Sequence, residues 1–293
     1  MSWHRLSTIA TTESAHAIAE ALESHGARAV SLLDAADQPL YEPAPGATPI
    51  WANTRVEGLF EASVDWEAVA SQVAASLGLA GATWRCEPLE DQVWERVWME
   101  RFKPMRFGRD LWIYPSTHPV PDSLTAVVRL DPGLAFGTGT HATTALCLEA
   151  LDAMPPTAQR VIDYGCGSGV LAIAALVLGA QAAWCHDIDP QALLASEENA
   201  RRNNVATRLT TVTSPRDLGD VGAELILANI LSAPLRELAP TFASLLAPGG
   251  RLVLSGILAP QCEVLMGHYA PWFAQVRLRT QEEWACIEAV RLP

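Results

Sequence analysis

The N-terminal part of the chain alternates between strand-like and helix-like spacings of hydrophobic positions. A helical run begins after Thr11, a residue suited to an N-cap, and stops at Gly26; a second begins near Asp65 and ends at Gly78. Strand-like stretches surround these helices at residues 2–9, 27–33, 54–62 and 82–89. The resulting order, βαββαβ, resembles a ferredoxin-like α+β unit. Because no catalytic cluster appears in it, we interpret residues 1–89 as a packing or recognition domain.

A charged segment, residues 90–102, joins this domain to the rest of the chain. Trp94 and Trp98 are spaced as on one face of a helix, and the pattern ends before Pro104. The segment therefore predicts a short exposed linker helix. Its tryptophans either pack between the domains or contact a ligand.

From residue 103 onward, apolar strand-like runs alternate with helical runs. The strand-like runs are "RVIDYG", "QAAWCHD", "LTTVTS", "AELILANI" and "RLVLSGI". Such alternation is typical of an α/β fold, a parallel sheet with helices on both faces. The last run, "FAQVRLRTQEEWACIEAVRL", has no helix between its extended halves, so it predicts an antiparallel hairpin at the sheet edge.

Composition narrows the classes of function. The 293 residues carry a formal net charge of −13, which disfavours unspecific nucleic-acid binding because phosphate contacts need clustered Lys and Arg. No run of about 18 uncharged apolar residues and no signal-peptide pattern occurs, so we expect a cytoplasmic protein without a membrane partner. The six cysteines form no C-x-x-C pair, which favours reduced core thiols over a zinc site.

A glycine cluster, "DYGCGSG", follows the first strand of the second domain. Glycines at the end of a parallel strand let the backbone approach a ligand at a helix N-terminus. A dinucleotide fingerprint needs a glycine three positions after Gly167, but Val170 stands there and the third glycine is Gly169. Asp163, before the cluster, would repel a pyrophosphate and attract an ammonium group. A cationic amino-acid ligand therefore fits better than a nicotinamide cofactor.

An acidic residue, Asp187, ends the second strand about 20 residues after the glycines, where a carboxylate can accept hydrogen bonds from both ribose hydroxyls. Without the glycine cluster upstream, Asp187 would be interpreted as a solvated charge at the end of a strand. Asp189, followed by Pro190, predicts the N-cap of the next helix. Together the glycine cluster and Asp187 predict S-adenosyl-L-methionine as the cofactor.

Long stretches of the chain resemble the PrmA-type family of bacterial ribosomal protein methyltransferases. They are "WERVWMERFKPMRFG", "DPGLAFGTGTHATT", "VIDYGCGSGVLAIAALVLGA", "DIDPQALLASEENARRNNV" and "LANILSAPLRELAP", and "GLAFGTGTH" is highly specific. The resemblance implies a Rossmann-like class I S-adenosylmethionine-dependent methyltransferase domain over residues 103–293, with a smaller N-terminal α+β ferredoxin-like domain that recognises the substrate. It also implies methylation of lysine side chains and of the α-amine of large-subunit ribosomal protein eleven, free or on the ribosome.

The same resemblance implies the residues of the site. The FGTGTH loop would fold over the methionine part of the cofactor, and Thr144 would contribute a contact. Gly165 and Gly167 would line the cofactor and Asp187 would hold the ribose. Asn229, at the end of the fourth strand, would contact the cofactor and face the reacting centre as the catalytic residue.

Some of these residues also suit purely structural roles. Thr140 can cap the helix that follows the FGTGTH loop, and asparagine favours strand-end turns, as at Asn229. His141 invites a general-base role, yet loop histidines commonly pack or form hydrogen bonds, so its role stays open.

Methyl transfer from S-adenosylmethionine needs a neutral amine and no metal. A lysine with a pKa near 10.4 is only about 0.04% neutral at pH 7, a cost of roughly 4–5 kcal/mol. We predict that the side-chain carbonyl of Asn229 orients the amine and that the proton goes to solvent. Three alternatives remain: a methyltransferase for another amine or a nucleobase, a nicotinamide oxidoreductase, and a protein that binds the cofactor without catalysis.

Overall fold

Two compact units make up the chain, Met1–Trp94 and Glu95–Pro293. The computed structural model describes residues 3–38, 40, 48–79, 81–89, 102–131, 139–219 and 221–293. Residues 90–101 of the predicted linker helix and the FGT part of the FGTGTH loop lie outside these ranges. Within them, no helix is long and apolar enough to cross a membrane.

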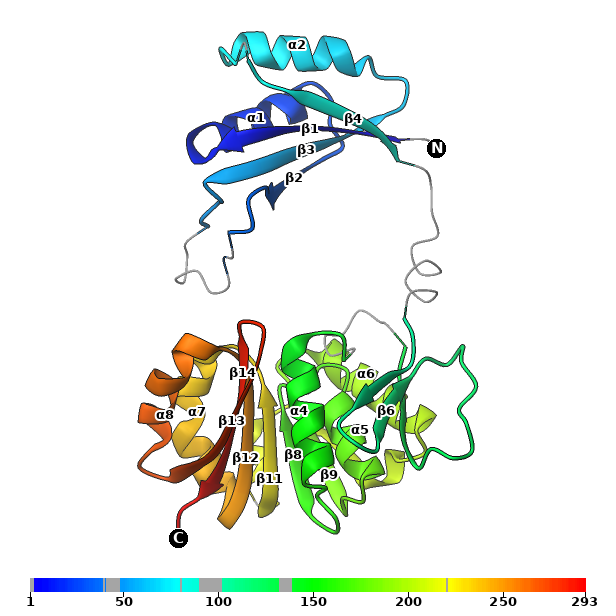
Figure 1. Ribbon diagram of the computed structural model, residues 1–293, viewed down its shortest axis with the longest axis vertical. Coiled ribbons are helices and arrows are strands. Elements are labelled where there is room, and N and C mark those ends of the chain that lie inside the picture. The colour runs from blue at the N-terminus through cyan, green and yellow to red at the C-terminus, as the bar shows by residue number, and fades with distance from the viewer. Residues whose placement is uncertain are drawn as a thin grey trace. The chain divides into compact units, whose positions relative to one another are not determined.

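The first unit is a four-stranded antiparallel sheet with two helices (Figure 1). Its elements are β1 Trp3–Thr11, α1 Thr12–Ser24, β2 Ala29–Asp34, β3 Asn53–Glu61, α2 Trp66–Ser76 and β4 Trp84–Leu89. The βαββαβ order is the predicted one, and the strand order is β2-β3-β1-β4. Alternate strand residues such as Leu6 and Val56 are buried against Ile18 and Leu22 of α1, which gives the unit its own core.

A small three-stranded sheet opens the second unit. It contains β5 Met105–Phe107, β6 Leu111–Tyr114 and β7 Ala126–Arg129. The sequence analysis missed these strands because three or four residues are too few to establish an alternating pattern. Asp152 fixes the turn before β6, since its Oδ1 accepts hydrogen bonds from the backbone N–H groups of Asp110 and Leu111, both at 2.9 Å.

The large sheet of the second unit has seven strands in the order β10-β9-β8-β11-β12-β14-β13. The strands are β8 Arg160–Tyr164, β9 Ala182–His186, β10 Leu209–Val212, β11 Ala223–Asn229, β12 Leu246–Leu258, β13 Phe273–Gln281 and β14 Trp284–Arg291. The first five are parallel, and β14 and β13 form the predicted antiparallel hairpin at the edge.

Helices cover both faces of this sheet (Figure 1). On one face lie α4 Ala142–Ala153, α5 Val170–Val177 and α6 Pro190–Arg202; on the other lie α7 Ser232–Leu245 and α8 Cys262–Tyr269. Successive strand residues point to opposite faces, so Val161 belongs to the first core and Ile162 to the second, and both are fully buried. All six cysteines are free thiols and five of them are buried, as predicted.

Candidate active site

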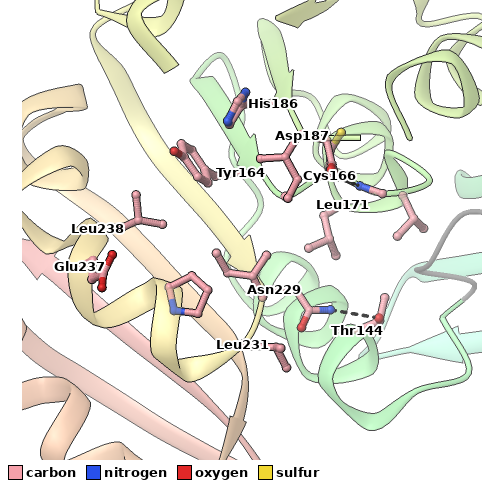
Figure 2. Close-up of a pocket in the computed structure, with 16 residues that line it drawn as sticks. Thr144, Tyr164, Cys166, Leu171, His186, Asp187, Asn229, Leu231, Glu237 and Leu238 are labelled. Carbon is pink, nitrogen blue, oxygen red and sulfur yellow. Dashed lines mark hydrogen bonds between the residues drawn. The ribbon is translucent and has the colours of Figure 1, made fainter. Parts of the chain in front are cut away.

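A cavity of about 530 Å³ lies at the carboxyl ends of β8, β9 and β11. Here the strand order reverses, and such a switch point is where open α/β sheets bind ligands. All five predicted site residues line this first cavity: Thr144, Gly165, Gly167, Asp187 and Asn229. Figure 2 shows Glu237 and Leu238 on the α7 side of the cavity, with Asp187 and Cys166 on the other side. The fold thus brings together residues up to 85 positions apart in the sequence.

The glycine cluster forms a tight loop between β8 and α5. Gly165, Gly167 and Gly169 all have positive φ, at 79°, 53° and 74°, a conformation that strongly favours glycine. A Cβ on Gly165 would also collide with Cγ2 of Ile230. The backbone N–H of Gly165 donates to the carbonyl oxygen of His186 at 2.7 Å. The loop is therefore held against β9 and leaves space that a ligand can occupy.

Asp187 lies on the wall of the first cavity and also supports the glycine loop. Its Oδ2 accepts a hydrogen bond from Gly167 N at 2.9 Å, and its Oδ1 accepts one from Asp189 N at 3.0 Å. Asp189 caps α6, as predicted, because its Oδ1 accepts from Gln191 N at 2.9 Å. The two neighbouring acids thus have different roles: Asp187 borders the first cavity, and Asp189 caps α6.

Thr144 and Asn229 meet across the other end of the cavity (Figure 2). Nδ2 of Asn229 donates a hydrogen bond to Oγ1 of Thr144 at 3.1 Å. Oδ1 of Asn229 is buried and has no hydrogen-bond partner among the described residues. Leaving a buried carbonyl unpaired costs about 1–3 kcal/mol, so this oxygen is suited to accept a hydrogen bond from a bound ligand.

A second cavity, of about 390 Å³, adjoins the first. Three residues border both cavities: Asn229, Ile230 and Leu231. The remaining wall includes His141 and Trp284, whose rings pack edge to face with centroids 4.9 Å apart. Sequence reasoning missed Trp284 because nothing near it in the hairpin forms a motif. The unpaired Asn229 carbonyl therefore stands at the junction of two cavities.

His141 has a structural role at the start of α4. It is the N-cap residue, and its Nδ1 accepts a hydrogen bond from Thr143 N at 3.3 Å. The expectation that Thr140 caps this helix was wrong, because the helix begins at Ala142 and the capping position therefore falls on His141.

Asp163 has a different position from the predicted one. Its carboxylate does not border the first cavity and is only 1% exposed. Oδ2 accepts a hydrogen bond from Ala172 N at 3.0 Å, so the side chain fixes the first turn of α5 instead of facing an ammonium group. Burial raises the pKa of this carboxyl to about 7.

The order of the large sheet, its switch-point cavity and the glycine loop define a Rossmann-like methyltransferase that uses S-adenosylmethionine. The residues present fit this cofactor: the glycine loop borders a cavity of about 530 Å³, Asp187 offers a carboxylate, and Asn229 offers a carbonyl with no partner among the described residues. The chain belongs to the family described as "Ribosomal protein L11 methyltransferase (PrmA)", whose model matches residues 2–292.

Relatives resemble the chain along its whole length. It is 49% identical over 292 residues to the ribosomal protein L11 methyltransferase of Actinobacillus pleuropneumoniae serotype 3, covering 99% of this chain and 100% of the relative. It is 50% identical over 291 residues to that of Methylococcus capsulatus, covering 99% of each. A crystal structure of ribosomal protein L11 methylase from Lactobacillus delbrueckii subsp. bulgaricus is similar with a TM-score of 0.59 and 32% identity, covering 66% of this chain and all of the other.

Proposed function

We propose that this chain transfers methyl groups from S-adenosylmethionine to lysine side-chain amines and the α-amine of ribosomal protein L11. The observation that carries the proposal is the buried, unpaired Oδ1 of Asn229 at the junction of the two cavities. The substrate is supported by relatives at about half identity that bear the name ribosomal protein L11 methyltransferase. We propose that the chain acts in the cytoplasm on ribosomal protein L11 that is free or on the ribosome.

The first cavity would hold the cofactor, with its sulfonium methyl group already activated for transfer. Gly165 and Gly167 would lie against it, because both line the first cavity. Asp187 would accept hydrogen bonds from the ribose hydroxyls. Thr144 would border the methionine part and, through its hydrogen bond, fix the amide of Asn229.

The second cavity would admit the acceptor amine. Since Nδ2 of Asn229 is held by Thr144 at 3.1 Å, Oδ1 is the atom left to accept a hydrogen bond from an amine N–H. That bond would direct the nitrogen lone pair toward the methyl group in the first cavity. The apolar wall of Leu231 and Trp284 favours the neutral amine by desolvation, and the proton would be lost to solvent before each transfer. Among the described residues no cluster suited to a metal ion occurs.

The N-terminal unit would recognise the protein substrate. It has a core of its own and, in its described residues, none of the residues that line either cavity. Specific protein recognition generally buries more than about 1,000 Å², which an amine-accepting cavity cannot provide. We therefore propose residues 1–89 as the recognition domain, 90–102 as a linker helix and 103–293 as the catalytic domain.

Transfer of a labelled methyl group tests this function. The purified chain, given S-adenosylmethionine with a tritiated methyl group and a ribosomal extract from cells that lack the activity, should label one small protein, identified as ribosomal protein L11 by mass spectrometry. Asn229→Ala should strongly reduce the label while leaving cofactor binding detectable. Self-labelling is easily controlled, because Lys103 is the only lysine of the chain and the chain's own α-amine is the only other primary amine. Label in ribosomal RNA, or in another protein, would overturn the assignment.

A further inference from the structure

Two polar side chains of α6, Ser196 and Asn199, contact the glycine loop without lining the first cavity. Ser196 is fully buried, and its hydroxyl donates a hydrogen bond to the carbonyl oxygen of Gly167 at 3.1 Å. Asn199 is 8% exposed, and its Nδ2 donates to the carbonyl oxygen of Ser168 at 2.9 Å. Neither side chain borders the cavity. Residues three apart share one helix face, so the pair holds two successive carbonyl groups of the loop.

The loop needs this support because of its glycines. Three positive-φ glycines within five residues make the segment conformationally permissive, and ordering glycine costs more backbone entropy than ordering other residues. If Ser196 and Asn199 were absent, the carbonyls of Gly167 and Ser168 would each lose a hydrogen bond donated from α6. The loop would then gain stability by turning these peptide groups toward water.

The same peptide segment is tied to the cavity wall. The N–H of Gly167 donates to Asp187 Oδ2 at 2.9 Å, while its carbonyl oxygen accepts from Ser196. The loop also packs tightly against α6, since a Cβ on Gly169 would lie 2.7 Å from Ser196 Oγ. The position of Gly167 is thus fixed from both sides, by Asp187 and by α6.

We propose that Ser196 and Asn199 are positioning residues that set the affinity for S-adenosylmethionine by holding the glycine loop in its binding conformation before the cofactor arrives. A loop ordered in advance does not have to be ordered on binding, and such preorganisation raises affinity without any contact to the ligand. The inference rests on the proposed place of the cofactor in the first cavity, and it does not depend on the identity of the methyl acceptor.

Asn203, the C-cap residue of α6, offers a matched control. Its Nδ2 donates to Arg129 O and to the backbone carbonyl of Asn199, both at 2.8 Å, and its Oδ1 accepts from Arg129 N at 2.6 Å, so it ties the end of α6 to β7. It has no contact with the glycine loop among its hydrogen bonds. Asn203→Ala therefore removes a comparable set of backbone hydrogen bonds and should lower the melting temperature without changing the loop.

The test is calorimetric titration of the full chain with S-adenosylmethionine, with the melting temperature of each variant measured in parallel. Ser196→Ala and Asn199→Ala should each weaken binding about tenfold, whereas Asn203→Ala should leave the Kd within twofold. Asn199→Asp, which replaces the donor by an acceptor at the same size, should weaken binding at least as much as Asn199→Ala.

In turnover assays, Ser196→Ala should raise KM for S-adenosylmethionine while leaving kcat and KM for the protein substrate unchanged. Wild-type affinity in both Ser196→Ala and Asn199→Ala would overturn the proposal. So would an equal loss of affinity in Asn203→Ala, because general destabilisation of α6 would then suffice. Titration needs no methyl acceptor, so a failure of the proposed function would be distinguishable from a failure of this inference.

Discussion

Asp187 provides the sharpest test of the cofactor site, because its carboxylate has two separable roles. Within the chain it accepts two backbone hydrogen bonds, from Gly167 at 2.9 Å and from Asp189 at 3.0 Å. In the complex it would also accept hydrogen bonds from the ribose. Hydrogen bonds to charged groups contribute about 1.5–3 kcal/mol each, and about 1.4 kcal/mol corresponds to a factor of ten in Kd. Asp187→Ala should therefore weaken S-adenosylmethionine binding at least tenfold.

Loss of loop support alone would also weaken binding, so the ribose contact must be isolated. We suggest a thermodynamic cycle in which Asp187→Ala and the wild-type chain are each titrated with S-adenosylhomocysteine and with its 2′-deoxy and 3′-deoxy analogues. In the wild-type chain, removal of a hydroxyl that Asp187 holds should cost about tenfold or more. In Asp187→Ala the same removal should cost little, because the partner is already gone.

Asp189→Ala serves as the control for this cycle. It removes a neighbouring carboxylate that caps α6 and does not border the first cavity, so it should cost about 1 kcal/mol of stability. The penalty for each deoxy analogue should stay at its wild-type value. Equal penalties in the wild-type chain and in Asp187→Ala would refute the ribose contact, even if overall affinity had fallen.

Three further predictions concern the reaction, the domains and stability. The value of kcat/KM should rise with pH above 7, because more lysine is neutral, and a chelator should not alter it; metal-restored activity after chelation would contradict the mechanism. Removal of residues 1–89 should leave S-adenosylmethionine binding nearly intact and abolish methylation of ribosomal protein L11, with circular dichroism confirming the fold; a full-length rate would exclude a recognition role. Burial raises the pKa of Asp163 from 3.8 to about 7, so the unfolded state releases its proton first as pH rises, and the free energy of unfolding should fall between pH 4 and 7 by up to about 4 kcal/mol. Asp163→Asn should lack this part of the pH dependence in urea titrations; an unchanged dependence would show that Asp163 is ionised at little cost.

The pattern of apolar runs was enough to predict most of the large sheet. β8, β9 and β11 each consist of a short apolar run ended by glycine or a polar residue, and a strand buried on both faces has that pattern. The carboxyl ends of such strands meet at one edge, so the pattern places Asp187 near the glycine loop. The place of Asn229 was implied by the family resemblance and not by the pattern.

What the sequence could not reveal depends on register and on tertiary contacts. Trp284 reaches the second cavity because β14 pairs with β12, which sets Trp284 opposite Leu258. No local pattern relates it to His141, more than 140 positions earlier. Ser196 and Asn199 are similar cases: on a helix with many charged residues they resemble solvent-facing positions, and only the packing of α6 against the loop shows that they are buried.

The chemistry of the acceptor explains why an amide, and not a carboxylate, suits the end of β11. An amide donates to Thr144 with one atom and presents a neutral carbonyl with the other. A carboxylate at that position would favour the ammonium form of the lysine and raise its pKa, adding to the roughly 4–5 kcal/mol that deprotonation already costs at pH 7.

The charges of the chain agree with the need for a neutral acceptor amine. The chain carries a net charge of −13, which attracts a basic protein over long distances. The described residues that line the second cavity, however, include neither aspartate nor glutamate. In the proposed mechanism a lysine would be drawn toward the protein by distant charges that water and salt screen, and it would meet no carboxylate among the described residues of the second cavity wall that could hold it as ammonium. Asn229→Asp should reverse this arrangement and move the rise of kcat to higher pH, because the added carboxylate would raise the pKa of the bound lysine. Asn229→Ala should lower kcat without moving its pH profile.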